Sequence, residues 1–114
     1  MASERPGATD MARYDVFANP FAPERSHTPY VLDVQNDHLG PYATRVVVPL
    51  RSPKGFGVPA SGLNPGFTVA GKAVVLDTAA IAAVPAQLLK SPVMRAQAWR
   101  SEVQDALDTL FGSF

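Results

Sequence analysis

The sequence predicts a small, mainly β domain that ends in one amphipathic α-helix. Three observations carry this prediction: short segments rich in β-branched and aromatic residues, turns rich in Gly and Pro between them, and a helical apolar repeat near the C-terminus. The chain has 114 residues, enough for one domain with a modest hydrophobic core. Short strands followed by one helix are typical of a small β-barrel, or a curved sheet, with the helix packed on it.

The N-terminal part begins with a segment that contains few apolar residues. Residues 1–10 are small, polar and turn-forming, so we expect a flexible leader ahead of a single domain over residues 11–114. Residues 14–17, Tyr-Asp-Val-Phe, are rich in strand formers, and the following Asn-Pro ends this strand. Residues 21–28 contain one proline and two charged side chains, lie between Pro20 and Pro29, and are expected to form an exposed loop.

Two more strands are predicted in the middle of the chain. Residues 30–35 alternate between apolar and polar side chains, and residues 36–42 then contain the turn signal Gly-Pro. Residues 45–50 read Arg-Val-Val-Val-Pro-Leu, a β-branched run that is expected to be buried on both faces. Because Pro49 has no N–H to donate, we expect it at a sheet edge, at a bulge or at the end of the strand.

The next segments are less regular. Residues 52–62 are rich in Pro and Gly and are expected to be irregular. Residues 67–69 and 73–76 flank Ala-Gly-Lys and predict a hairpin, in which Gly supplies the unusual backbone angles. Residues 79–89 are rich in Ala and interrupted by Pro, a pattern that fits either a short helical turn or another strand.

The clearest element is the C-terminal helix, predicted over about residues 97–111, with charged residues opposite its apolar face. Gly112 is expected to end it, as Gly does after a last helical turn. The terminal Phe114 is then either packed on the protein's own core or a dimer partner, or exposed as an apolar anchor for another protein. The apolar positions of the helix are Trp99, Val103, Ala106, Leu107, Leu110 and Phe111.

Composition narrows the possible functions. Ten basic and ten acidic residues cancel, whereas nucleic-acid-binding proteins usually carry a basic excess, so no direct nucleic-acid binding is expected. The absence of Cys excludes a disulfide framework, a thiolate metal site and a Cys nucleophile. The sequence contains neither a signal peptide nor an apolar run near the ~20 residues of a membrane span, so a cytoplasmic location without a membrane partner is expected.

Few side chains suggest chemistry. Asp33, Asp37 and His38 could bind a metal, but their spacing matches no usual ligand set, and turn-capping carboxylates are the favoured interpretation. Arg45 could stabilise a phosphate transition state, although pairing with a carboxylate at the end of its strand is favoured. His27 is expected to be a solvated loop residue. We therefore expect no enzyme activity, no cofactor and no metal.

Two blocks of the sequence resemble the CcdB toxins. Residues 32–37, Leu-Asp-Val-Gln-Asn-Asp, are similar to the family's Val-Asp-Val-Gln-Ser-Asp, and residues 45–50 are similar to its Arg-Met-Val-Ile-Pro-Leu, with the same spacing between the blocks. Residues 63–65 and 83–85 resemble the family's Leu-x-Pro and Ser-Val-Pro. The resemblance covers about residues 11–114.

The resemblance implies a fold, an activity and partners. The fold would be an SH3-like barrel of the CcdB and MazF (Kid) type with a C-terminal helix, assembled as a homodimer. CcdB toxins belong to type II toxin–antitoxin modules. They bind the A subunit of DNA gyrase and trap its complex with cleaved DNA, and a disordered CcdA antitoxin wraps the dimer and extracts it. This chain would therefore be a topoisomerase poison that a CcdA-like antitoxin neutralises.

The resemblance also implies which residues contact gyrase, and several of them differ from the family's residues. Two consecutive Ile of the family correspond to His38 and Leu39, and a helix Asn corresponds to Asp108. Gly112 replaces a Trp, and losing a Trp hot spot typically costs ~2–4 kcal/mol of binding free energy. The family's terminal Phe-Trp-Gly-Ile corresponds to Phe111, Gly112, Ser113 and Phe114.

Two alternatives follow from these differences. One is a non-toxic homologue that binds the antitoxin without poisoning gyrase and acts as a decoy or in transcription regulation of its operon. The other is a MazF-like endoribonuclease on the same fold, which the zero net charge disfavours.

Overall fold

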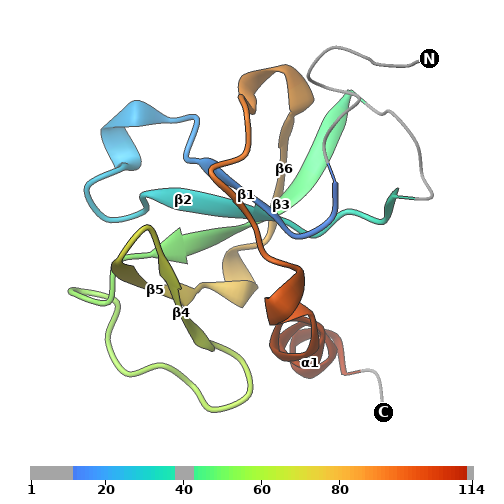
Figure 1. Ribbon diagram of the computed structural model, residues 1–114. Helices are drawn as coiled ribbons and strands as arrows, with labels where there is room; N and C mark the ends of the chain where they lie inside the picture. Colours follow the sequence, from blue (N-terminus) through green and yellow to red (C-terminus); the bar gives the residue numbers. More distant parts are fainter. Residues whose placement is uncertain (1–11, 38–42, 113–114) are drawn as a thin grey trace.

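The computed structural model describes residues 12–37 and 43–112. These residues form a strongly bent, antiparallel, barrel-like sheet with one α-helix, α1 (Arg100–Phe111), packed across its open side (Figure 1). The predicted mainly β fold with one C-terminal helix is therefore confirmed. The strands are β1 (Asp15–Ala18), β2 (Tyr30–Asp33), β3 (Thr44–Arg51), β4 (Gly66–Val69), β5 (Lys72–Leu76), β6 (Ala82–Pro85) and β7 (Met94–Arg95).

The sheet is organised around β3, the eight-residue strand that contains the β-branched run. One side of β3 pairs with β2, which in turn pairs with β1, and β1 pairs with the short β7. The other side of β3 pairs first with β6 and then with β5, whose hairpin partner is β4. One long strand thus belongs to both halves of the sheet, which bends along it (Figure 1).

Pro49 lies in the interior of β3, opposite Val31 of β2, so its predicted place at an edge, a bulge or a strand end is wrong. β6 pairs with residues 44–47 of β3 and β5 pairs with residues 50–51, which leaves Pro49 between them. Its carbonyl accepts a hydrogen bond from the backbone N–H of Asp77 at 2.9 Å. Because neither strand pairs at this position, the missing N–H interrupts no ladder.

The β4–β5 hairpin was predicted, but its turn is one residue shorter than the Ala-Gly-Lys loop that the sequence indicated. Lys72 pairs with Val69, so only Ala70 and Gly71 connect the strands. Both adopt positive φ, 50° and 81°, as a two-residue type I′ turn requires. Gly tolerates this backbone, whereas Ala carries a steric penalty there.

Other segments refine the predictions. The predicted strand over residues 30–35 ends at Asp33, whose Oδ1 accepts the backbone N–H of Gln35 at 2.9 Å. The Ala-rich stretch over residues 79–89 contains both predicted possibilities, since β6 lies between two 3₁₀ turns, η4 (Thr78–Ala80) and η5 (Ala86–Leu88). The loop over residues 21–28 is exposed except at its last residue and includes a third 3₁₀ turn, η2 (Ala22–Glu24).

Both faces of the sheet are covered, which explains the continuous apolar run of β3. The main core fills the space between the sheet and α1, and a smaller cluster lies on the other face. Residues of β1, β2 and β3 alternate between these cores with the period of two that a strand imposes. The main core includes Val16, Leu32, Val48, Leu50, Leu76, Val103 and Ala106, and the second core consists of Phe17, Val31, Val47, Val84 and Leu89.

The C-terminal helix matches its prediction closely. A 3₁₀ turn, η6 (Gln97–Trp99), leads directly into α1, and Gly112 ends the helix with φ 65° while its N–H donates to the Asp108 carbonyl at 2.8 Å. Trp99 stacks on Phe67 of β4, with 4.1 Å between the ring centroids, and so attaches the start of the helix to the sheet. In the described part of the chain, no helix is long and apolar enough to cross a membrane.

Candidate protein-binding surface

A buried ion pair holds the end of β2 in place. Arg45 of β3 donates to both carboxylate oxygens of Asp33, at 2.7 Å and 2.9 Å, and both side chains are almost completely buried. Burial raises the pKa of Asp33, and the hydrogen bonds from Arg45 oppose this shift. The predicted pairing of Arg45 with a carboxylate is confirmed, and the guanidinium is engaged with it.

The turn after β2 presents a second carboxylate. Asp37 is exposed, lies 3.7 Å from the guanidinium of Arg45, and accepts the backbone N–H of Arg13 at 2.9 Å. The carboxylates of Asp33 and Asp37 thus bind arginine and backbone N–H groups. Within residues 12–37 and 43–112, no group of three or more metal-binding side chains comes together.

The segment just before β1 links this turn to the helix. The guanidinium of Arg13 donates to Gln104 Oε1 at 3.2 Å, and Gln104 Nε2 donates to Asp108 Oδ1 at 3.2 Å. The backbone of Arg13 meanwhile contacts Asp37, as described above. One residue therefore connects the turn that precedes His38 with the helix face that carries Asp108.

Tyr14, which was predicted to begin the first strand, lies just before β1 in a strained conformation. Its φ is 73°, in the left-handed region, which costs a non-Gly residue about 1–2 kcal/mol. Two backbone hydrogen bonds hold it there: its N–H donates to the Asp33 carbonyl at 2.7 Å, and its carbonyl accepts from Ala96 at 2.8 Å. Strain of this kind is frequent at functional sites.

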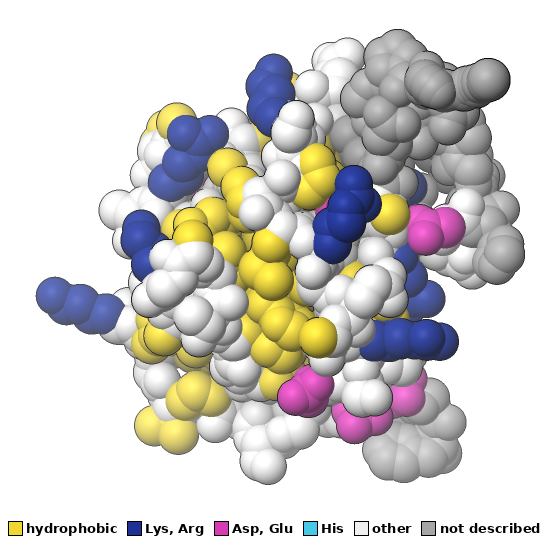
Figure 2. All heavy atoms as spheres, in the orientation of Figure 1, with side chains coloured by type: hydrophobic (Ala, Val, Ile, Leu, Met, Phe, Trp, Pro, Cys, Tyr) yellow, Lys and Arg dark blue, Asp and Glu magenta, His cyan; other side chains and the backbone are white. Residues whose placement is uncertain are grey.

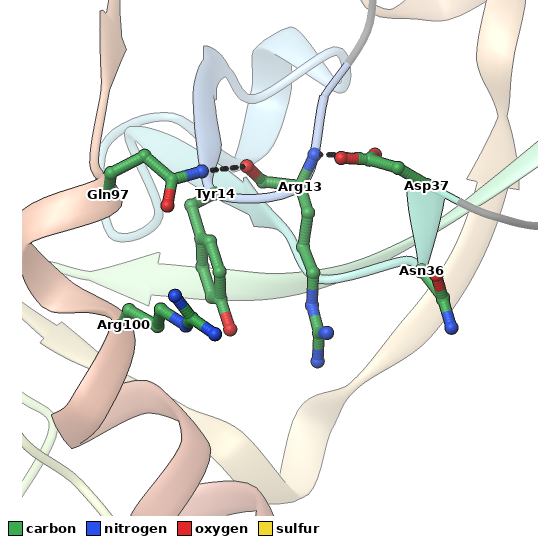
Figure 3. Close-up of a pocket in the computed structure, with 6 residues that line it drawn as sticks. All are labelled: Arg13, Tyr14, Asn36, Asp37, Gln97 and Arg100. Atoms are coloured by element: carbon green, nitrogen blue, oxygen red, sulfur yellow. Dashed lines mark hydrogen bonds between the residues drawn. The ribbon is translucent and has the colours of Figure 1, made fainter.

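A pocket of about 210 Å³ opens at this junction (Figure 3). Its lining is polar and comes from three places: the approach to β1, the turn after β2 and the start of α1. The guanidinium carbon of Arg13 lies 5.2 Å from the centre of the Tyr14 ring, within range of a cation–π contact. The lining residues are Arg13, Tyr14, Asn36, Asp37, Gln97 and Arg100.

The end of α1 is the second prominent feature of this surface. Phe111 is 67% exposed, although the helix buries Val103, Ala106 and Leu107. An exposed aromatic ring at a helix end costs free energy in water and suits contact with another protein. Figure 2 also shows a band of hydrophobic side chains down the middle of the face that it displays.

The structure describes only some of the residues that the sequence predicted to contact gyrase. Asp108 is half-buried and hydrogen-bonded to Gln104, while Phe111 and Gly112 form the end of the helix. His38, Leu39, Ser113 and Phe114 lie outside the described residues.

Sequence reasoning missed several residues of this surface. Arg100 and Gln104 lie at four-residue spacing on the same helix face as the predicted Asp108, and this spacing was a signal that they act together. Arg13 had no such signal, because its partner Gln104 lies 91 residues away in the chain.

The fold and this surface define a small antiparallel barrel-like domain whose C-terminal helix and adjoining strand ends form a polar, partly aromatic surface. Comparison with known families identifies it further: the family model described as CcdB protein matches residues 13–112, nearly the whole chain. The chain therefore belongs to the CcdB family, as the sequence resemblance predicted. No curated protein matches the sequence.

Proposed function

We propose that this protein is a CcdB-like toxin of a type II toxin–antitoxin module that inhibits DNA gyrase by binding its A subunit. The match to the CcdB family over residues 13–112 is the observation that carries this proposal. In keeping with it, an exposed aromatic residue, Phe111, occupies the helix end that the family directs at gyrase. A CcdA-like antitoxin would neutralise the toxin in the cytoplasm, where gyrase acts.

The proposed mechanism is binding without catalysis. The protein acts as a homodimer, and its two helix ends enter the space between the gyrase A subunits and hold the enzyme on cleaved DNA. Phe111 supplies an apolar anchor, and the left-handed conformation of Gly112 ends the helix immediately after it. The zero net charge and the apolar band in Figure 2 support self-association, since little charge repulsion opposes it.

One observation favours a second candidate function. Gly112 stands where gyrase-poisoning relatives carry a Trp, and a Gly contributes no side chain to a binding hot spot. A homologue that binds its antitoxin but leaves gyrase active would serve as a decoy or co-repressor in its operon.

Expression in bacteria distinguishes the two functions. The wild-type chain, a chain that lacks residues 112–114, and Phe111→Ala would be induced, and growth and gyrase supercoiling would be measured. Val58→Ala is the matched control, because Val58 is 95% exposed and belongs to the loop between β3 and β4 rather than to α1. A gyrase inhibitor arrests growth and supercoiling, and loses both effects on truncation or in Phe111→Ala but not in the control.

Two results would contradict the proposal of gyrase inhibition. If the wild-type chain leaves growth and supercoiling unchanged but binds the protein encoded directly upstream, the decoy function is correct. If growth arrest is unaffected by truncation, the helix end is not the inhibitory element.

A further inference from the structure

We propose that the pocket formed by Arg13, Tyr14, Asn36, Asp37, Gln97 and Arg100 binds a carboxylate side chain from an acidic segment of a partner protein. This inference rests on the proposed function only in expecting a protein partner, and it does not require that the partner be gyrase. Charge, hydrogen bonding, size and position support it.

The pocket carries two guanidinium groups that lack a carboxylate partner among the residues that the structure describes. Neither Arg13 nor Arg100 forms an ion pair with any residue of the described ranges 12–37 and 43–112. Among the described lining residues Asp37 alone has a carboxylate, and it lies beside Arg45 and accepts the Arg13 backbone N–H. The lining therefore has an excess of positive charge, although the whole chain is neutral.

Arg13 is held in place yet incompletely hydrogen-bonded. Its Nη2 donates to Gln104 and its guanidinium lies near the Tyr14 ring, which together fix the side chain. Its Nε is buried and has no hydrogen-bond partner within the described part of the protein. A buried donor without an acceptor is costly, and a carboxylate can accept two parallel hydrogen bonds from one guanidinium.

Arg100 occupies an unfavourable position for a cation. It is the first residue of α1, a helix of twelve residues, and the partial positive charge of a helix N-terminus repels a positive side chain. Its side chain is exposed and points toward the Tyr14 hydroxyl in the pocket (Figure 3). An anion bound in the pocket beside Arg100 would offset this repulsion and would itself be favoured by the helix dipole.

The size of the pocket selects the occupant. About 210 Å³ lies below the roughly 300–1,000 Å³ typical of small-molecule sites, so the pocket suits one side chain rather than a nucleotide or a cofactor. A nucleic-acid backbone is disfavoured because a neutral chain lacks the extended basic surface that it needs. An acidic side chain on a peptide is small enough for the pocket and needs no extended basic surface.

The position of the pocket connects it to the rest of the contact surface. Gln104 bonds to Arg13 on one side and to Asp108 on the other, so a polar side-chain network links the pocket to the helix face that carries Asp108. A segment with its acidic residue in the pocket can therefore continue toward Phe111 at the end of α1. The pocket would fix its register and the apolar helix end would add affinity.

The test is an NMR titration of the ¹⁵N-labelled full chain with acetyl-tetraglutamate-amide. Acetyl-tetraglutamine-amide and inorganic phosphate serve as parallel probes, and the Nε–Hε signals of the arginines report directly on the pocket. We expect saturable shifts of the Arg13 and Arg100 signals with tetraglutamate alone. Arg100→Gln should weaken binding about tenfold or more, since hydrogen bonds to charged groups contribute about 1.5–3 kcal/mol.

Lys54→Gln removes the same charge from an exposed, distant loop and should leave the affinity unchanged. The proposal is overturned if tetraglutamate produces no shift, if tetraglutamine binds equally well, or if Lys54→Gln weakens binding as much as Arg100→Gln does. Equal shifts with phosphate would also overturn it, because the pocket would then be a general anion site. These outcomes are independent of gyrase: a chain that binds the peptide but leaves supercoiling intact refutes only the proposed inhibition.

Discussion

Arg45→Met should strongly destabilise the protein because it leaves a buried carboxylate without its counter-charge. Met is close to Arg in length and keeps the apolar packing of the β3 position. Asp33 would remain fully buried at 0% exposure, with a single backbone N–H, that of Gln35, still donating to it. Removing one partner of a buried ion pair typically costs about 3–5 kcal/mol, and both hydrogen bonds from Arg45 would be lost.

A control variant separates the stability loss in Arg45→Met from a general effect of removing an arginine. Arg51→Met removes the ion pair of Arg51 with Asp77, whose N–O distance is 2.8 Å but whose side chains are 32% and 17% exposed. Solvent screens that pair, so a loss of about 1 kcal/mol or less is expected. Because a domain of this size has about 5–15 kcal/mol of stability, only Arg45→Met should place the protein close to unfolding.

Urea denaturation followed by the fluorescence of Trp99 measures both variants, since the ring stacks on Phe67 and leaves this contact on unfolding. The double variant Asp33→Asn, Arg45→Met should recover much of the lost stability, because no buried charge remains. A loss of less than 1 kcal/mol in Arg45→Met at pH 7, or no recovery in the double variant, would refute the reasoning.

The pH dependence gives an independent check on the same pair. Burial raises the pKa of Asp33 above its ordinary 3.8, so the folded state takes up this proton more readily than the unfolded chain. The resulting contribution to stability is greatest below pH 3.8 and is lost as the pH rises through the raised pKa. Arg45→Met removes a group that lowers this pKa, so its destabilisation should be largest at neutral pH and should shrink on acidification. A constant difference between pH 7 and pH 4 would contradict this account.

Three further predictions concern stability and can be measured by the same denaturation assay. Ala70→Gly should raise stability by about 0.5–1 kcal/mol, because Ala70 has a φ of 50°; the same change at Ala73, inside β5, should lower it, and a loss at both positions would contradict the turn assignment. Leu76→Ala should cost about 2–5 kcal/mol, since this side chain is 0% exposed and its removal leaves a cavity in the main core. Phe111→Ala should change stability by less than about 0.5 kcal/mol while reducing partner binding, because the ring is 67% exposed; a large stability loss would show that it packs on the protein itself.

Local patterns in the sequence were sufficient for much of the fold. The helix ends at Gly112 as expected, because a helical repeat and a glycine stop are both encoded in neighbouring residues. The β3 run was correctly expected to be buried on both faces, since its apolar residues are consecutive. The place of Pro49 could not be predicted in this way, because it depends on which strands pair with β3 on that side.

The sequence by itself determined the fold class, the C-terminal helix and the family, because these depend on local periodicity and on short motifs at fixed spacing. It also predicted contact residues at Asp108, Phe111 and Gly112, which the structure places in the last part of α1 and at its end. Only the tertiary structure decided that Arg13 joins Asp37 to the helix and that a cationic pocket opens between them. The physical reason is distance along the chain: Arg13 and Gln104 are 91 residues apart, and only the folded sheet and helix bring them within hydrogen-bonding distance.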